Sequence, residues 1–408
     1  MKKIVVTGMG AVTPVGIGVE NYWNNITAGA SGIDTIKTFD PSELAVQIAG
    51  EVKDFNPSDY LPKDLIRKTD PFMQYAYIAA EEAMKQSGIE IEPERTGIVM
   101  GTAMAGIATI AYTQEALTGA SHKKVGPRFI PKILGNIAAA NIAIDYNIQG
   151  PSFTVSTACS SGGDAINTAC MCMQSGKADI MLAVGAESVL CPLVIYSLAN
   201  AKALSRRNDL PSTASRPFDV TRDGFVIGEG GGALVLETEE HALARGAKIY
   251  AEIRGCGNTD DAYHVTAPHP EGRGAIACMK QAIAEAGINP SDIGYINAHG
   301  TATNKGDTVE TSSIKKVFGN TLPYVSSTKG ATGHMMGAGG ITETITCVKA
   351  IETGTVPPTI NLNEVDPECA GIDFVANTAK KAEINFAMSN AFGFGGQNSS
   401  IIVGKYGK

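Results

Sequence analysis

Short apolar runs alternate along the chain with longer amphipathic stretches. Runs rich in β-branched residues include "KKIVVTG" (2–8), "TGIVMGT" (96–102), "IMLAVGAES" (180–188) and "SSIIVG" (399–404). They predict buried strands. Residues 72–88 and 275–287 place apolar side chains at helical spacing, and each stretch ends at a glycine, which commonly terminates a helix. The alternation predicts an α/β fold with buried central strands.

The order of these segments repeats in the second part of the chain. Residues 96–106, 154–176 and 180–188 are followed later by the similar series 293–307, 324–354 and 386–396. In each series a second strand leads through a turn into a helix of small residues that closes on glycine, and a third strand follows. We therefore expect two duplicated halves, residues 1–250 and 251–408, whose corresponding turns face one pocket.

Net charge, the length of apolar runs and cysteine spacing exclude several classes of function. The net charge is −8, from 33 basic and 41 acidic residues, and no long basic run suggests a general nucleic-acid binder. No apolar run approaches the roughly 18 residues that a membrane span needs. The eight cysteines are scattered without a zinc-binding spacing. We expect a protein of the reducing cytoplasm that holds no metal.

One cysteine, Cys159 in "TVSTACSSGGDAI", lies where a strand gives way to a helix expected from Ser160 onward. A helix N-terminus favours the thiolate through its unpaired N–H groups and its dipole. The small residues that follow leave room for a substrate above the sulfur. On this pattern alone, a nucleophile and a small buried cysteine are equally good interpretations.

Two histidines shift that balance. His299, in "NAHGTAT", directly follows a predicted strand, and His334, in "STKGATGHMMGAGG", lies in a loop that enters a helix. Each is a polar side chain among glycine, threonine and alanine, where it needs a partner. Both lie in the same kind of turn as Cys159, which favours a shared catalytic pocket.

Several motifs, in one order along essentially the whole chain, resemble those of the β-ketoacyl-acyl-carrier-protein synthases, the condensing enzymes of bacterial type II fatty-acid synthesis. The motifs are "VVTGMGAVTPVG", "TACSSG", "SRPFDVTRDGFVIGEGGG", "DAYHVTAPHPEG", "NAHGTAT", "SSTKGATGHMMGAGG" and "SNAFGFGGQN". The resemblance implies a thiolase-like fold, with two similar α/β halves in a five-layered αβαβα arrangement, and a homodimer. This agrees with the repeat described above.

The resemblance also implies catalytic roles. Cys159 would accept the acyl chain from a carrier-protein thioester. His299 and His334 would promote decarboxylation of malonyl-carrier protein and steady the enolate. Lys329 would organise the second histidine, with Glu310 as the carboxylate partner of the lysine.

Five further residues take their implied roles from the same motifs. Phe394 would gate the site, and its backbone N–H would form an oxyanion hole with that of the nucleophile. Thr301 and Thr303 would bind the pantetheine arm. Met104 would line the acyl pocket, and Phe392 would also contact substrate.

The implied reaction is a decarboxylating Claisen condensation that lengthens an acyl chain by two carbons and gives 3-oxoacyl-acyl-carrier protein. Two fixed backbone donors suit the tetrahedral oxyanion, and two neutral imidazoles suit the enolate without a metal or other cofactor. The phosphopantetheine is carried by the partners, acyl-carrier protein and malonyl-carrier protein. Basic residues that would dock these acidic partners are Lys63, Arg67, Lys68, Lys123, Lys124, Arg128, Arg206 and Arg207.

Three other functions were weighed against this one. A thiolase would carry a second cysteine near the C-terminal glycine loop, where "GFGFGGQN" has none. A non-catalytic chain-length factor would lack the active cysteine, whereas Cys159 is present. A polyketide-type ketosynthase would use the same residues for the same chemistry, and it stays open as the alternative.

Overall fold

The central sheet has twelve strands in the described residues: two sets of five, and the short strands β2 and β13, which pair with β1 and β11. The computed structural model describes residues 2–119 and 125–408. The strands of the first set are β1 (Ile4–Thr13), β5 (Thr96–Gly101), β6 (Ser152–Val155), β7 (Ile180–Glu187) and β8 (Gly230–Thr238). Those of the second set are β9 (Ala251–Asp260), β10 (Ile293–Asn297), β11 (Tyr324–Ser326), β15 (Phe386–Phe392) and β16 (Gln397–Gly404).

The two sets share one strand order and one pattern of strand directions. The order is β6-β5-β7-β8-β1 in the first set and β11-β10-β15-β16-β9 in the second. In each set the first three strands are parallel and the last two join in antiparallel pairs. The predicted duplication is confirmed. The sets meet where β1 pairs antiparallel with β9, from Ile4↔Ile253 to Val6↔Ala251.

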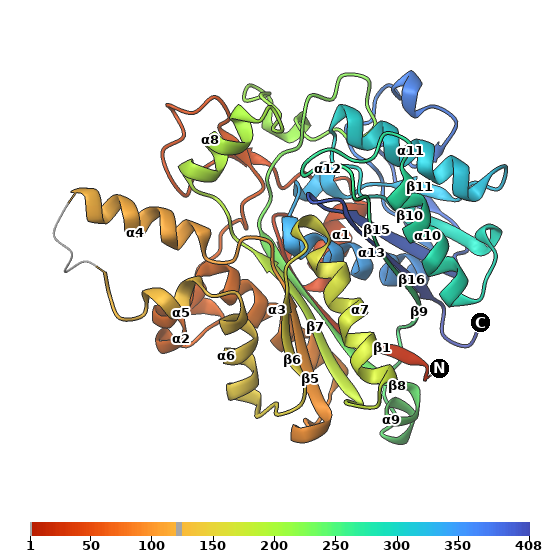
Figure 1. The fold of residues 1–408 in the computed structure, drawn as a ribbon, viewed down its shortest axis with the longest axis horizontal. Coiled ribbons are helices and arrows are strands. Elements are labelled where there is room, and N and C mark those ends of the chain that lie inside the picture. Colours follow the sequence, from red (N-terminus) through yellow and green to blue (C-terminus); the bar gives the residue numbers. More distant parts are fainter. Residues whose placement is uncertain (1, 120–124) are drawn as a thin grey trace.

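Helices form three layers around the two sets of strands. The middle layer holds α7 (Ser161–Gln174) and α13 (Gly339–Thr353), which contact each other and strands of both sets. On the outside, α3 (Pro71–Ser87) covers β1 and β8, while α10 (Arg273–Ala286) covers β9 and β16. The predicted αβαβα layering is therefore confirmed. In Figure 1 the first half, red to green, fills the left and lower part, and the second half, cyan to blue, fills the upper right.

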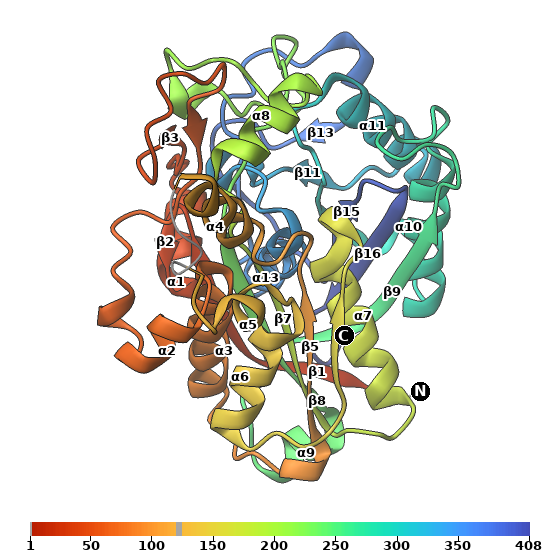
Figure 2. The same cartoon turned by 60° about the vertical axis from the view of Figure 1, so that its left-hand side comes forward.

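The remaining elements lie in the connections (Figure 2). The helices are α1 (Val19–Thr27), α2 (Lys63–Lys68), α4 (Ile107–Gly119), α5 (Phe129–Ile133), α6 (Asn136–Tyr146), α8 (Pro192–Asn200), α9 (Glu239–Ala244), α11 (Asn304–Phe318) and α12 (Lys329–Thr332). The short strands are β2 (Gly16–Ile17), β3 (Asp34–Thr35), β4 (Ile48–Ala49), β12 (Thr355–Val356), β13 (Asp373–Phe374) and β14 (Lys380–Lys381).

Local sequence explains where the outer helices begin and end. The Asp70 side chain accepts the backbone N–H of Phe72 and caps α3, whose first residue, Pro71, has no N–H to satisfy. Gly88 and Gly287 close α3 and α10 in the left-handed conformation, with φ of 60° and 66°. The predicted glycine stops are confirmed.

The two middle helices approach each other through glycines. A Cβ atom on Gly340 would lie 2.4 Å from the backbone nitrogen of Gly163, and one on Gly162 would lie 2.8 Å from the carbonyl oxygen of Gly337. Only glycine permits such close backbone contact. Because the contacts are at the N-terminal ends of α7 and α13, they bring together the turns that precede these helices.

Candidate active site

Cys159 lies in a one-turn 3₁₀ helix, η4 (Ala158–Ser160), between β6 and α7. The helix proper begins at Ser161, one residue later than the sequence predicts. Ala158 has a φ of +50°, in the left-handed region that residues other than glycine rarely adopt. The turn is thus a strained bend immediately before the nucleophile, and an alanine gives no sequence signal for it.

A buried carboxylate holds this bend in place by hydrogen bonds. Asp164, in the first turn of α7, accepts hydrogen bonds from the hydroxyls of Thr157 at 2.5 Å and Ser160 at 3.3 Å. It also accepts from the Asn258 side-chain amide on β9, at 2.6 Å. Sequence reasoning missed Asp164, because its partners come partly from the other half of the chain.

His299 and His334 meet Cys159 from the second half. His334 Nε2 lies 2.9 Å from the Cys159 sulfur. The two imidazole rings pack edge to face with centroids 5.4 Å apart. Burial lowers the pKa of both histidines well below the ordinary value, and the nearby charge of Lys329 lowers it further. Both imidazoles are therefore neutral at physiological pH.

The protonation state of the cysteine differs from the sequence-based expectation. Burial raises the pKa of Cys159 to about 11, although a hydrogen bond from the Phe394 backbone and the charge of Lys329 oppose the rise. The cost of burying a thiolate outweighs the helix N-terminus. The resting group is a thiol, and the neutral His334 beside it is placed to take its proton.

The lysine has a different partner from the one predicted. The Lys329 ammonium pairs with Glu343 on α13, and both side chains are buried. The prediction that Glu310 pairs with Lys329 is wrong. Glu310, on α11, instead accepts the backbone N–H groups of His299 at 2.8 Å and Gly300 at 2.7 Å. Both of its oxygens hold the turn that carries the first histidine.

Only its distance along the chain from Lys329 could have pointed to Glu343 in the sequence. It lies fourteen residues after Lys329, beyond the turn at His334. No local motif marks it, because the pair forms when α13 folds back against α12.

The glycine loop between β15 and β16 closes one side of the pocket. The Phe394 ring is 42% exposed, while its backbone bonds to the Cys159 sulfur. Gly395 and Gly396 have φ of 93° and 87°, and the Gly395 N–H donates to the Val265 carbonyl at 2.7 Å. The loop therefore places backbone at the nucleophile and an aromatic ring towards solvent.

The four residues expected to bind substrate lie on different loops. The hydroxyls of Thr301 and Thr303 are 3.1 Å apart on the turn that follows His299. The Phe392 ring lies 5.8 Å from that histidine, centroid to centroid. Met104, on the loop between β5 and α4, is 36% exposed. Their roles stay predictions.

Metal-binding clusters and membrane-spanning helices are both absent from the described residues. Within residues 2–119 and 125–408, no group of three or more His, Cys, Asp or Glu side chains is arranged to hold a metal ion. Over the same residues, no helix combines the length and the apolarity that crossing a bilayer requires.

Comparison with known proteins relates this geometry to one family. The family model described as beta-ketoacyl synthase, N-terminal domain, matches residues 1–242, and the model for the C-terminal domain matches residues 250–363. The 3-oxoacyl-(acyl-carrier-protein) synthase 2 of Coxiella burnetii is 44% identical, over 99% of both chains. The protein of the same name from Staphylococcus aureus is 42% identical, again over 99% of both.

Solved structures agree. A beta-ketoacyl synthase from Burkholderia phymatum superposes with a TM-score of 0.90 at 34% identity, covering 99% of this chain and 100% of that one. The ishigamide ketosynthase/chain length factor superposes with a TM-score of 0.93 at 34% identity, with both chains fully covered. With matching sequence models, full-length relatives and the same fold, this chain belongs to the beta-ketoacyl synthase family.

Proposed function

We propose that the protein is an acyltransferase, a 3-oxoacyl-acyl-carrier-protein synthase of the second type. It joins an acyl chain held on Cys159 to malonyl-acyl-carrier protein and gives 3-oxoacyl-acyl-carrier protein, longer by two carbons. The observation that carries this proposal is the 2.9 Å contact between the Cys159 sulfur and His334 Nε2, with the His299 ring beside it.

In the first half-reaction, the thiol of Cys159 attacks the acyl thioester. Its proton passes to His334 and then to the departing pantetheine sulfur, so that acyl-enzyme and free carrier thiol form. The tetrahedral oxyanion is held by the backbone N–H groups of Cys159 and Phe394. The raised pKa of the thiol is the reason that a neighbouring base is needed.

In the second half-reaction, malonyl-carrier protein loses CO₂ and leaves an enolate. The neutral His299 donates an N–H to its thioester oxygen, and His334 donates a second after its proton moves to Nε2 by a tautomer change between the half-reactions. The enolate carbon attacks the acyl carbonyl, the Cys159 thiolate leaves, and one proton taken up from solvent restores the thiol. Neutral histidines suit this step because their N–H groups are available without the cost of burying charge.

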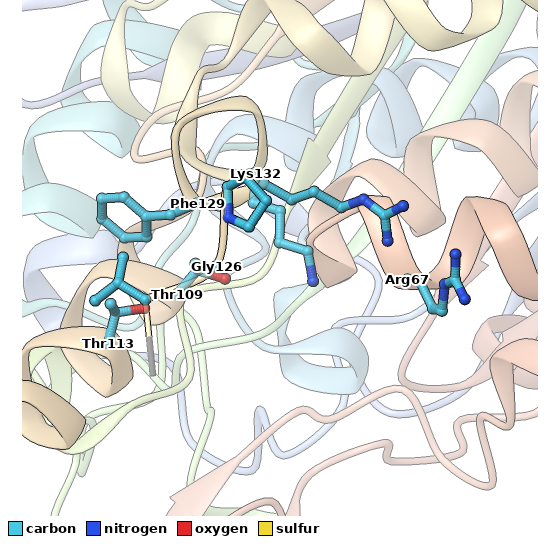
Figure 3. Close-up of a pocket in the computed structure, with 9 residues that line it drawn as sticks. Arg67, Thr109, Thr113, Gly126, Phe129 and Lys132 are labelled. Carbon is cyan, nitrogen blue, oxygen red and sulfur yellow. The ribbon is translucent and has the colours of Figure 1, made fainter. Parts of the chain in front are cut away.

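Carrier protein docks, in this proposal, at a basic cavity on the surface of the first half. The cavity has a volume of about 460 Å³ and lies among α2, α4 and α5, as Figure 3 shows. Arg67, Arg128 and Lys132 line it and supply positive charge for an acidic partner. Of the basic residues predicted for docking, Lys123 and Lys124 lie outside the described residues.

The proposal includes a homodimer formed along β6. This strand is at the end of the sheet order, and Phe153 on it is 48% exposed. An unpaired edge with an exposed aromatic side chain favours pairing with a second copy. A cytoplasmic location is part of the same proposal, supported by the eight cysteines, each a free thiol.

Fatty-acid elongation is preferred to polyketide synthesis because of the relatives. The full-length curated relatives reported above are 3-oxoacyl-acyl-carrier-protein synthases at 42–44% identity. A type II polyketide ketosynthase solved in complex with its acyl-carrier protein is 33% identical.

The test uses purified protein with acyl-carrier and malonyl-carrier proteins. Intact-protein mass should show an acyl adduct on wild type, and malonyl-carrier protein should then release CO₂ and yield the 3-oxoacyl product. Cys159→Ala should form no adduct, whereas Cys172→Ala, on the following helix α7, should form it as wild type does. An adduct that persists in Cys159→Ala would exclude this nucleophile.

A further inference from the structure

Glu187 at the end of β7 collects hydrogen bonds from two loops that belong to different halves of the chain. Its Oε1 accepts the Thr102 hydroxyl at 3.0 Å and the Met104 backbone N–H at 3.1 Å. Its Oε2 accepts the backbone N–H groups of Ala103 at 2.6 Å and Gly337 at 3.1 Å. Three donors follow β5, and the fourth follows the second catalytic histidine.

These contacts favour an ionised carboxylate. All four partners donate, so both oxygens must accept. Glu187 is fully buried, and burial raises its pKa to about 6, while the hydrogen bonds from the two loops oppose the rise. The charge of the buried group is therefore stabilised by the loops that it holds.

The backbone beside these contacts is strained in both loops. Ala105, next to Met104, has a φ of +48°, and Met336, next to Gly337, has a φ of +45°. Residues other than glycine rarely adopt this left-handed region, and they keep it only where their surroundings fix it. In both loops the fixed contact is to the same carboxylate.

The two loops also touch each other directly. A Cβ atom on Gly337 would lie 2.8 Å from the backbone nitrogen of Ala103. Met336 packs in the same apolar cluster as Cys159. The Met104 loop and the segment that follows His334 are therefore in direct backbone contact.

We propose that Glu187 is a positioning residue that couples the acyl-chain site at Met104 to the placement of His334. The inference rests on the proposed function and on the sequence-based prediction that Met104 lines the acyl pocket. A long chain that presses on the Met104 loop also acts, through Glu187, on the histidine that serves both half-reactions.

The main test is Glu187→Gln, which keeps the shape but turns one acceptor into a donor facing backbone N–H groups. Acylation of Cys159 from dodecanoyl-carrier protein should fall about tenfold to hundredfold, and from butyryl-carrier protein by about threefold or less. Malonyl decarboxylation should also fall about tenfold. The wild-type pH profile should change near pH 6, and the variant should lose that change, since its side chain does not titrate.

A matched control is Glu229→Gln. Glu229 is also a buried carboxylate, but its hydrogen bonds come from Tyr75, Ser188 and the Val52 backbone N–H instead of from either loop. The Glu229→Gln variant should change the thermal stability. It should not change the ratio of the acylation rates from dodecanoyl-carrier protein and butyryl-carrier protein. Thr102→Val is a milder second variant, which removes one of the four donors and should shift that ratio in the same direction as Glu187→Gln.

The outcomes separate this inference from the proposed function. Wild type that yields no 3-oxoacyl product contradicts the proposed function itself. Active wild type with equal losses at both chain lengths in Glu187→Gln and Thr102→Val assigns Glu187 a purely structural role and overturns the coupling. Loss of only one half-reaction also overturns it, because a coupling residue must affect both.

Discussion

At the scale of single residues, burial sets the protonation of the pocket. Cys159 is a thiol and both histidines are neutral, because each charged form would lose its hydration inside the protein. The catalytic cysteine is thus activated by its neighbour when substrate arrives, and it does not rest as a thiolate.

Alkylation of Cys159 should report this state directly. With a pKa of about 11, the thiolate fraction at neutral pH is small and grows about tenfold for each pH unit. The rate of iodoacetamide labelling should therefore climb steadily from pH 7 to pH 9, followed on the Cys159 peptide by mass spectrometry. A plateau below pH 8 would mean a thiolate stabilised in the free enzyme.

The two histidines should have separable roles. Replacing His299 with alanine should slow malonyl decarboxylation about 10²- to 10⁴-fold and leave acylation nearly intact. His334→Ala should slow both steps, because its Nε2 contacts the sulfur at 2.9 Å. Single-turnover acylation and CO₂ release measure the two steps, with His264→Ala on the surface as control. Equal acylation rates in the two variants would contradict the role of His334 as base.

At the scale of helices and strands, the site depends on the contact between α7 and α13. Their glycines allow the two turns to meet, so each half of the chain contributes part of the chemistry: the nucleophile from one, the histidines from the other. The backbone, more than any single side chain, sets the distance between Cys159 and His334.

Gly340→Ala should therefore damage the site. Its Cβ would lie 2.4 Å from the Gly163 nitrogen, and overpacking of this kind costs about 1–3 kcal/mol, more than alanine gains in a helix. Thermal unfolding should show the loss, and condensation should slow with it. The neighbouring Gly339→Ala is the control, since the nearest atoms to its Cβ would be those of the Glu343 carboxylate, at 3.5 Å or more, which is ordinary van der Waals contact. If both variants match wild type, the helices have room to separate.

Most of these helices and strands could be predicted from the sequence, because they follow local patterns. Features that depend on tertiary contacts could not. The strands and helices follow local periodicity, and the repeat of three segments reveals the duplicated halves. Ala158 and Met336 could not be predicted as left-handed residues, since only tertiary contacts hold them there. Glu343 was missed for a related reason: its pairing with Lys329 joins two helices that no local pattern connects.

At the scale of the whole molecule, the first set of strands ends at an open edge, β6. The Met104 loop lies between β5 and α4, and β5 is the neighbour of that edge. Pairing of two copies along β6 would cover Phe153 and complete the surroundings of the acyl pocket.

Phe153→Asp should dissociate this dimer. Loss of a central aromatic contact costs about 2 kcal/mol or more, which is roughly thirtyfold in Kd, and charges facing each other across the axis add to it. Sedimentation at several concentrations measures the change. Leu243→Asp on α9, 57% exposed and away from the edge, should leave the dimer intact. Identical sedimentation of Phe153→Asp and wild type would place the interface elsewhere.

The pairing of β1 affects how the chain folds while it is being synthesised on the ribosome. β1 is the first strand to be synthesised. Apart from the two-residue strand β2, which pairs with its end at Val12 and Thr13, its neighbours β8 and β9 come much later, and the Thr7 hydroxyl donates to Glu237, 230 residues further along. Until that segment emerges, the apolar residues Ile4, Val5 and Val6 have no strand to pair with. Such non-local closure is slow and leaves a nascent chain prone to aggregation. We therefore expect the folding of the newly made chain to depend on chaperones that bind unfolded segments. This dependence should be greater than its short loops and local helices alone would suggest.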